Sequence, residues 1–184
     1  NPGESLAAGQ IYDSNRFTIY GMLDRLGVDT LDMGIIPDDR ETIRQAFSKA
    51  ARQADAVITS GGVSVGEADF VTETLRDMGT VGFWKVAIKP GRPIAFGKIE
   101  DKLFFGLPGN PVSVMATFYQ LVRPVLLRLR GEARPAPEVL VKAECRARLR
   151  KKPGRMEFQR GVLCRDSDGK YIVDTTGHQG AGVL

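Results

Sequence analysis

Residues 56–66 read AVITSGGVSVG, a short apolar run that leads directly into a turn rich in glycine and serine. A brief run of this kind is typical of a strand buried inside a parallel sheet. The residues that follow, from about 69 to 78, have the apolar spacing of a helix. A strand, a tight turn and a helix in this order predict part of a βαβ unit.

Alternating helical and extended patterns continue on both sides of this stretch. Upstream, the spacing predicts a helix over residues 15–26, a strand over 28–36 and a second helix that begins near Asp38. Because no strand precedes the first helix, we expect the first strand of the sheet to lie upstream of Asn1. The alternation predicts an α/β domain in which a mostly parallel sheet lies between two helical layers.

Downstream, the chain continues with strands and one long helix. Extended runs are predicted over residues 81–88, 93–99 and 102–107, followed by a helix over residues 112–130. Pro124 lies inside this helix and should kink or divide it, because proline cannot donate a backbone hydrogen bond.

A short linker then separates the α/β domain from a second one. Residues 131–137 have the composition of a linker. Beyond it the pattern predicts only strands, over residues 139–149, 156–164 and 171–175. Because three strands rarely form an independent sheet, we predict an α/β domain over residues 1–131 and part of a small all-β domain over residues 138–184.

Composition narrows the class of protein. Residues 1–130 carry 15 Lys and Arg against 15 Asp and Glu, so no nucleic-acid-binding face is expected there. The net charge of +4 comes from residues 131–184, where a basic run over residues 146–155 fits a solvated strand face better than an anion site.

No apolar run reaches the ~20 residues of a membrane span. Cys145 and Cys164 lack metal-ligand spacing and favour a reducing, cytoplasmic setting.

The turn at residues 60–66 can hold a phosphate. Ligands of open α/β sheets bind beyond the carboxyl ends of strands, and helix N-termini favour anions. Gly61 and Gly62 allow close backbone approach, while Ser60 and Ser64 can donate hydrogen bonds. The turn is neither a Walker loop nor a GxGxxG loop, and a tight connection without a ligand is the alternative.

Two carboxylates fall beside this turn. Asp38 follows the strand predicted over residues 28–36, and Asp69 lies just after the glycine-rich turn. Carboxylates next to a phosphate suit Mg²⁺, a hard cation that takes oxygen ligands. Helix capping is the alternative for both residues, and for Asp38 it is the favoured single role.

Cationic side chains and a second rigid turn complete the candidate site. Lys85 and Lys89, four residues apart on one predicted strand, should face the same side and repel unless an anion lies between them. Arg92 adds a third charge, and a lysine that points to solvent is the alternative. Residues 106–113 read GLPGNPVS and form a second turn, which leads into a helix. The backbone amides at the start of that helix and the Ser113 hydroxyl can hold a small oxyanion. A rigid turn without a ligand is the alternative.

Three of these motifs resemble, in order and spacing, those of the molybdopterin molybdotransferase family, which includes bacterial MoeA proteins and the gephyrin E domain. They are SGGVSVGEADF at residues 60–70, KVAIKPGRP at 85–93 and GLPGNPVS at 106–113. Four further segments are also similar: Asp13-Ser14-Asn15, GIIPDD at 34–39, MEFQRGV at 156–162 and TGHQG at 176–180. The resemblance therefore covers almost the whole chain and implies a MogA-like α/β domain followed by part of a β domain.

The resemblance also implies a reaction, in which adenylylated molybdopterin and molybdate give molybdenum cofactor and AMP, with Mg²⁺ required. It assigns catalytic roles to Asp69, Lys85 and Lys89 and metal binding to Asp38 and Asp69. It assigns substrate binding to Asp13, Ser14, Asn15, Ser60, Gly61, Gly62, Ser64 and Gly66. It assigns molybdate binding to Arg92, Pro108, Pro111 and Ser113.

Partners and alternatives follow from the same resemblance. The family resemblance implies that the longer parent protein forms a homodimer. It also implies that a MogA-like molybdopterin adenylyltransferase is a partner. Neither nucleic acid nor a membrane is expected as a partner. The family's upstream domains and its Thr-Gly-Asp-Glu segment are not in this sequence, so we expect the fragment to be inactive alone. The alternatives are an adenylyltransferase of the same fold, which should lack the two proline-glycine turns and the β domain, and a gephyrin-like scaffold.

Overall fold

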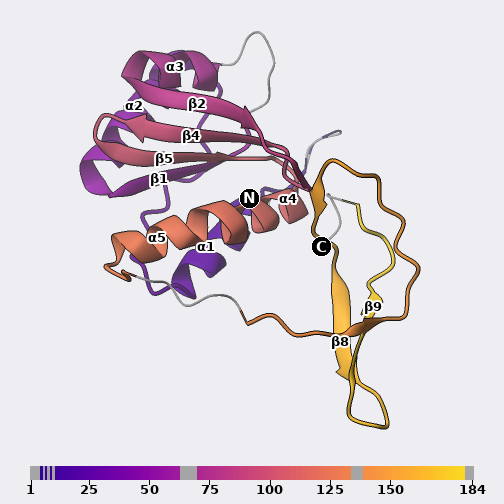
Figure 1. Cartoon of the computed structure of the whole chain (residues 1–184). Coiled ribbons are helices and arrows are strands. Elements are labelled where there is room, and N and C mark those ends of the chain that lie inside the picture. Colours follow the sequence, from indigo (N-terminus) through magenta and orange to yellow (C-terminus); the bar gives the residue numbers. More distant parts are fainter. Residues whose placement is uncertain are drawn as a thin grey trace.

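A four-stranded mixed sheet forms the centre of the first part of the chain (Figure 1). In spatial order its strands are β1 (Ala56–Ser60), β5 (Lys102–Leu107), β4 (Pro93–Ile99) and β2 (Gly79–Lys85). The computed structural model describes residues 5, 7, 9, 11–62, 70–133 and 139–180.

The direction of the strands differs in part from the prediction. β1 and β5 are parallel, whereas β4 is antiparallel to both β5 and β2. The sheet is therefore mixed over the described residues and not mostly parallel. The reason is local, because only Glu100 and Asp101 separate β4 from β5 and so short a connection can join only antiparallel strands.

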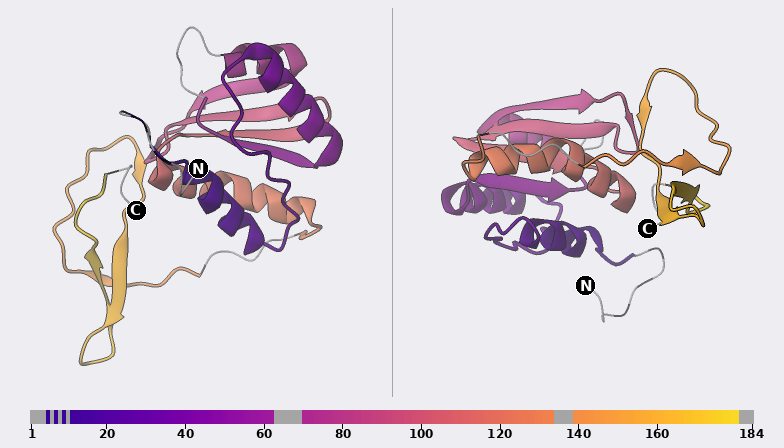
Figure 2. Two further views of the ribbon diagram at one scale, coloured as in Figure 1. Left: turned by 180° about the vertical axis from the view of Figure 1, so that it is seen from behind. Right: turned by 60° about the horizontal axis from the view of Figure 1, so that its bottom comes forward.

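Helices cover both faces of this sheet, as the α/β prediction requires (Figure 2). One layer contains α2 (Arg40–Gln53) and α3 (Phe70–Met78). The other contains α1 (Asn15–Asp24), α4 (Pro111–Thr117), the π-helical turn η1 (Phe118–Val122) and α5 (Arg123–Leu129). The predicted three-layer α/β architecture is confirmed.

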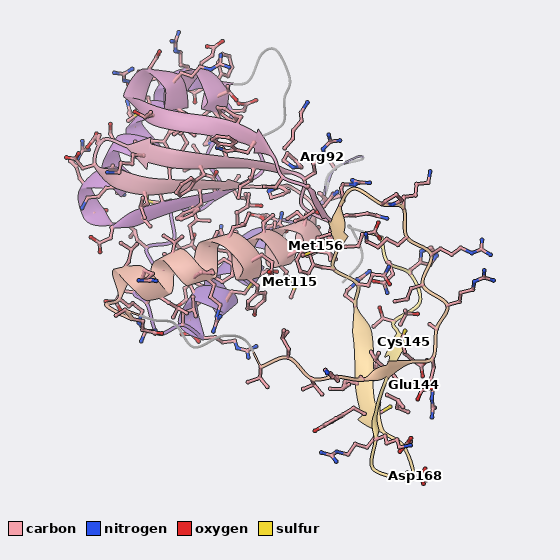
Figure 3. The ribbon with its side chains drawn as sticks, in the orientation of Figure 1. Arg92, Met115, Glu144, Cys145, Met156 and Asp168 are labelled. Atoms are coloured by element: carbon pink, nitrogen blue, oxygen red, sulfur yellow. The ribbon has the colours of Figure 1, made fainter. Side chains whose placement is uncertain are left out.

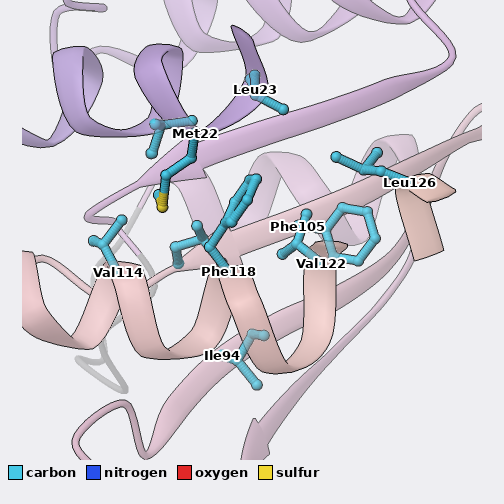
Figure 4. Packing of buried hydrophobic residues seen from close by; sticks show 10 residues of the cluster. Met22, Leu23, Ile94, Phe105, Val114, Phe118, Val122 and Leu126 are labelled. Atoms are coloured by element: carbon cyan, nitrogen blue, oxygen red, sulfur yellow. The ribbon is translucent and has the colours of Figure 1, made fainter. Parts of the chain in front are cut away.

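The core between α1, α4–α5 and the sheet holds the candidate site in place (Figure 4). Phe118, Val122 and Val114 on the long helix have no exposed surface, and they pack with Met22 of α1 and Phe105 of β5. Burial of each such side chain contributes about 1.5–3 kcal/mol relative to its exposure. The starts of α1 and α4 are thereby held against the same end of β5.

The long helix is divided as its proline predicted. The π-helical turn Phe118–Val122 comes just before Pro124 and accommodates the missing amide hydrogen bond. By length and composition alone, the helical run Pro111–Leu129 could cross a membrane. Its apolar side nevertheless forms the core described above, which accounts for its composition.

Two strand predictions were wrong. Residues 28–36 form no strand, because no described strand runs beside them to complete a ladder. The strand predicted over residues 81–88 ends at Lys85, where the Val86 amide donates to the Arg92 carbonyl oxygen at 2.9 Å and turns the chain back. Lys85 and Lys89 therefore do not lie on one strand.

The second part of the chain forms two small sheets. In one, β3 (Ile88–Lys89) of the α/β domain pairs in parallel with β7 (Met156–Glu157). In the other, β6 (Glu144–Cys145), β9 (Tyr171–Thr175) and β8 (Gly161–Arg165) lie in that order. Most of the predicted strand 139–149 is irregular, and Ile172 is the only buried residue of the described range 139–180. With no second layer to cover them, these strands stay short and exposed.

Candidate functional site

The side-chain amide of Asn15 joins two turns at one edge of the sheet. Its Nδ2 atom donates to Oγ of Ser60 at 2.8 Å and to the carbonyl oxygen of Gly109 at 2.6 Å. The Ser60 hydroxyl donates to the carbonyl oxygen of Pro108 at 3.4 Å. The turn after β1, the turn after β5 and the start of α1 therefore form one structural unit.

The register of the sheet explains why these turns meet. Ser60 pairs with Leu107 where the parallel strands β1 and β5 both end. The Gly61 amide continues this ladder by donating to the Leu107 carbonyl oxygen at 3.1 Å. Ligands of α/β sheets bind beyond the carboxyl ends of parallel strands, so this edge is the expected place for a site.

Glycine is needed in the turn after β1. Gly61 and Gly62 have φ angles of 81° and 66°, a region that favours glycine. A Cβ atom on Gly62 would also lie 3.0 Å from Cγ2 of Val71 in α3. The backbone of this turn is therefore left uncovered by side chains of its own.

Three predicted members of the site lie outside the described residues: Ser64, Gly66 and Asp69.

The Asn15 side chain leaves one polar atom unsatisfied. Its Oδ1 atom is buried and has no hydrogen-bond partner in the part of the chain that the structure describes. A buried acceptor without a partner costs about 1–3 kcal/mol. A ligand that donates an N–H or O–H group here would offset that cost, so the site favours a ligand with donor groups.

A cavity of about 1240 Å³ opens beside the turn after β1. Its lining includes the carboxylate residues Asp13 and Asp38 together with Ser60, Gly61 and Gly62. The Asp13 carboxylate also accepts a hydrogen bond from the Arg16 amide at 3.2 Å. Asp38 and the glycine-rich turn therefore line the same cavity.

The carboxylate that caps α2 is Asp39 and not Asp38. Asp39 Oδ1 accepts from the Thr42 amide at 3.0 Å, and the hydrogen bonds from Thr42 lower the pKa of Asp39. The capping role favoured for Asp38 is wrong because the helix begins at Arg40, one residue later than that role requires. Asp38 is exposed, which leaves its carboxylate accessible to a cation.

The described side chains offer few ligands for the predicted magnesium site. Within residues 11–62, 70–133 and 139–180, no group of three or more His, Cys, Asp or Glu side chains could hold a metal ion. Mg²⁺ needs fewer protein ligands than that, because it keeps several waters and binds phosphate oxygens. The exposed Asp38 carboxylate, which lines the same cavity as Gly61 and Gly62, fits such a site.

Lys85 and Lys89 lie in different sheets. Lys85 ends β2 opposite Pro93, at the sheet edge where β5 also ends, and its side chain is exposed. Lys89 lies in β3, and its Nζ atom is 3.6 Å from Oε2 of Glu157, whose side chain is only 9% exposed. Lys89 therefore already has an anionic partner, supplied by the β domain.

The Arg92 loop packs against the start of the long helix. A Cβ atom on Gly91 would lie 2.6 Å from Cγ2 of Thr117 and 3.3 Å from the carbonyl oxygen of Ser113. Ser113 is 4% exposed, whereas Arg92 is exposed at the junction with the β domain (Figure 3). Pro108 is buried, and Pro111 begins α4 as predicted. The four residues assigned to molybdate thus lie on two segments in contact.

Two contributors escaped the sequence analysis. The carbonyl oxygen of Gly109 accepts from Asn15, and the carboxylate of Glu157 pairs with Lys89. Every residue has a backbone carbonyl group, so the sequence cannot distinguish the one at Gly109 from the others. Glu157 lies in MEFQRGV, a segment noted above for its resemblance, but only the long-range pairing of β3 with β7 reveals its partner.

Comparison with known proteins identifies the family of this chain. Residues 2–128 match the family described as "Probable molybdopterin binding domain". Residues 142–184 match "MoeA C-terminal region (domain IV)". The chain belongs to the MoeA family of molybdenum cofactor biosynthesis proteins.

Relatives match this MoeA-family chain over 70–98% of its length. A molybdopterin molybdenumtransferase of Haemophilus influenzae is 48% identical over 97% of this chain and 44% of its own length. Gephyrin of Dictyostelium discoideum is 37% identical over 70% of this chain and 21% of its own. The MoeA structure from Pyrococcus horikosii has a TM-score of 0.76 and 30% identity, covering 98% of this chain and 43% of its own. The chain therefore spans less than half the length of these relatives.

Proposed function

We propose that the polypeptide carrying this sequence is a molybdopterin molybdotransferase, which converts adenylylated molybdopterin and molybdate to molybdenum cofactor with release of AMP. One observation carries the proposal. Asn15 ties the Ser60–Gly61 turn to the Pro108–Gly109 turn at a single sheet edge, where Lys85 also ends its strand. Hydrogen-bond donors, uncovered glycine backbone and positive charge are what a substrate with a phosphate bridge needs.

The two turns have separate tasks in this proposal. The backbone of the Gly61–Gly62 turn lies against the phosphate bridge, and Ser60 positions this turn through its bonds to Asn15 and Pro108. The exposed Lys85 ammonium stabilises the charge that develops as AMP leaves. Molybdate, a dianion, lies by the Pro108–Ser113 turn and the Arg92 guanidinium, which packs next to it through Gly91. Lys89, held by Glu157, completes the positive field from the β-domain side.

Mg²⁺ is part of the same proposal. Asp38 would hold it from the edge of the cavity, and the sequence assigns Asp69 as the second carboxylate. When bound, the ion neutralises phosphate charge. The residues of the chain supply the carboxylate oxygens and the backbone that orients the phosphate.

Assembly and setting are proposed with the function. Exposed apolar side chains in the β domain, among them Val139, Leu140 and Leu163, support a homodimer that would cover them. A MogA-like adenylyltransferase as donor of the substrate and a cytoplasmic location follow from the family resemblance. A structure of Molybdenum cofactor biosynthesis protein B shares the fold, with a TM-score of 0.50 at 19% identity over 65% of this chain. That likeness concerns the fold alone, so it does not favour adenylyl transfer.

The proposal is tested by measuring the release of AMP. The protein used is a polypeptide of the relatives' length that contains this sequence. Adenylylated molybdopterin, molybdate and Mg²⁺ are added to it. Lys85→Gln should lower the rate by about 10²–10³, the usual loss when a charge-stabilising group is removed. Lys98→Gln is the matched control, because Lys98 is also exposed but lies opposite Thr80, toward the far end of β4. Equal rates for both variants would remove Lys85 from the mechanism.

A further inference from the structure

Glu157 of the β domain holds a nearly enclosed carboxylate beside Lys89. The Glu157 side chain is only 9% exposed, and its Oε2 atom lies 3.6 Å from Nζ of Lys89. Withdrawing a carboxylate from water is costly unless a cation or hydrogen bonds accompany it. Lys89, to which the family resemblance assigns a catalytic role, supplies that cation. The pair therefore connects a charge of the candidate site to the β domain.

The backbone at Glu157 is fixed against the loop that carries Lys89. The Met156 amide donates to the carbonyl oxygen of Ala87, and the Phe158 amide donates to that of Lys89, both at 2.8 Å. In the resulting parallel pairing of β3 with β7, Glu157 is the partner of Lys89. These bonds join backbone atoms only, so they do not depend on the charge of either side chain.

Gln179 fixes the other end of the segment that carries Glu157. The Arg160 amide donates to Oε1 of Gln179 at 2.8 Å, and Nε2 of Gln179 donates to the Arg160 carbonyl oxygen at 3.0 Å. The Arg160 guanidinium donates to the carbonyl oxygens of His178 and Gly180 at 2.7 and 3.2 Å. The side-chain amide thus takes the place of a neighbouring strand and satisfies both backbone groups of Arg160. Glu157 therefore lies between two bonded points of the backbone.

The two members of the ion pair differ in conformational freedom. The Lys89 side chain is 54% exposed, and its ammonium ends a flexible four-carbon stem. The Glu157 carboxylate is enclosed on a backbone that is bonded on both sides. The carboxylate therefore determines where the ammonium lies, and not the reverse. At 3.6 Å the contact is an ion pair rather than a hydrogen bond, so the ammonium keeps its N–H donors for an anion.

We propose that Glu157 is a positioning residue of the anion site, which holds the Lys89 ammonium in place and so makes this charge depend on docking of the β domain. The inference rests on the proposed function. A charge that is already in place needs no reorganisation when negative charge develops on the substrate, and this lowers the barrier. Without the carboxylate, Lys89 would spread over many rotamers and stabilise that charge less.

The charge of Glu157 and its hold on Lys89 act on different kinetic constants. The negative charge repels an anionic substrate, so Glu157→Gln should leave the KM for molybdate unchanged or lower it. The hold on Lys89 serves the reaction step, so the same variant should lower kcat by about tenfold. Loosening of the β domain alone would raise KM as well, which distinguishes a positioning role from a merely structural one.

Crystal structures test the positioning without any need for activity. They compare the wild-type polypeptide of the relatives' length with its Glu157→Gln variant, in which the β3–β7 backbone bonds should persist. The Lys89 Nζ atom should occupy one position beside Glu157 in the wild type and no single position in the variant. One and the same position in both structures would overturn the proposal, whatever the AMP assay gives. Absence of AMP release by the wild type would instead count against the proposed function.

A double-mutant cycle decides whether Glu157 acts through Lys89. AMP release is measured for the longer polypeptide with Glu157→Gln, Lys89→Gln or both. The first change should lower kcat about tenfold and the second about a hundredfold, but Glu157→Gln should have no further effect once Lys89 is replaced. Asp77→Asn is the control, because it removes the ion pair of α3 with Arg40 of α2 and should leave kcat unchanged. An equal loss from Glu157→Gln with and without Lys89 would contradict the positioning role.

Discussion

Asn15 shows how a single side chain can define a site. Its amide spans two turns that are 45 and 94 residues away in sequence, and its position depends on the buried packing of α1 through Met22 and Leu23. Sequence reasoning recognised Asn15 only through a family resemblance. Its local pattern suggests a helix cap, and nothing in that pattern points to Ser60 or Gly109.

Replacing this amide should loosen both turns. Asn15→Ala removes both donated hydrogen bonds, and we expect a stability loss of about 1–3 kcal/mol in urea denaturation. Ser14→Ala is the stability control, because Ser14 is exposed and its side chain makes no capping hydrogen bond. If the two variants unfold at the same urea concentration, the amide does not hold the turns together.

The elements around the site were predicted unevenly. β4 and β5 match the predicted ranges because each is a continuous run bounded by turn residues, and α2 begins at Arg40, close to its predicted start near Asp38. The prediction of one strand over residues 81–88 was wrong because the break after Lys85 depends on two backbone pairings, one between residues six apart in sequence and one with a distant segment. The Arg92 carbonyl bonds to Val86, and β7 pairs with β3 from a segment about 70 residues later. Local periodicity contains neither contact.

The Arg92 loop depends on the absence of a side chain at Gly91. Gly91→Ala places a Cβ atom against Thr117 and also meets an unfavourable φ of 97°, so the loop should shift away from α4. We expect weaker molybdate binding by calorimetry in the longer polypeptide, with a lower Tm. Gly169→Ala is the steric control, since Gly169 also has a positive φ, of 78°, but a Cβ atom there meets nothing within 4 Å. Unchanged molybdate affinity in Gly91→Ala would separate this loop from the anion site.

At the scale of the whole molecule, an α/β domain carries the turns of the candidate site. A β domain contacts the loop that contains Lys89. The β3–β7 pairing and the Lys89–Glu157 ion pair attach the β domain to the loop between β2 and β4. The fold class was predictable because the alternation of strands and helices is strong. The exposed surface of the β domain was indicated in the sequence only by the small number of predicted strands.

The position of a bound oxyanion shows directly whether turns from separate elements form one anion site at the carboxyl edge of the sheet. Tungstate has the shape and charge of molybdate and gives an anomalous X-ray signal, so a crystal soaked with it locates the anion directly. We predict a peak at the Pro108–Ser113 turn within reach of Arg92. A peak confined to the basic run at residues 146–155, with none at the turn, would contradict the account.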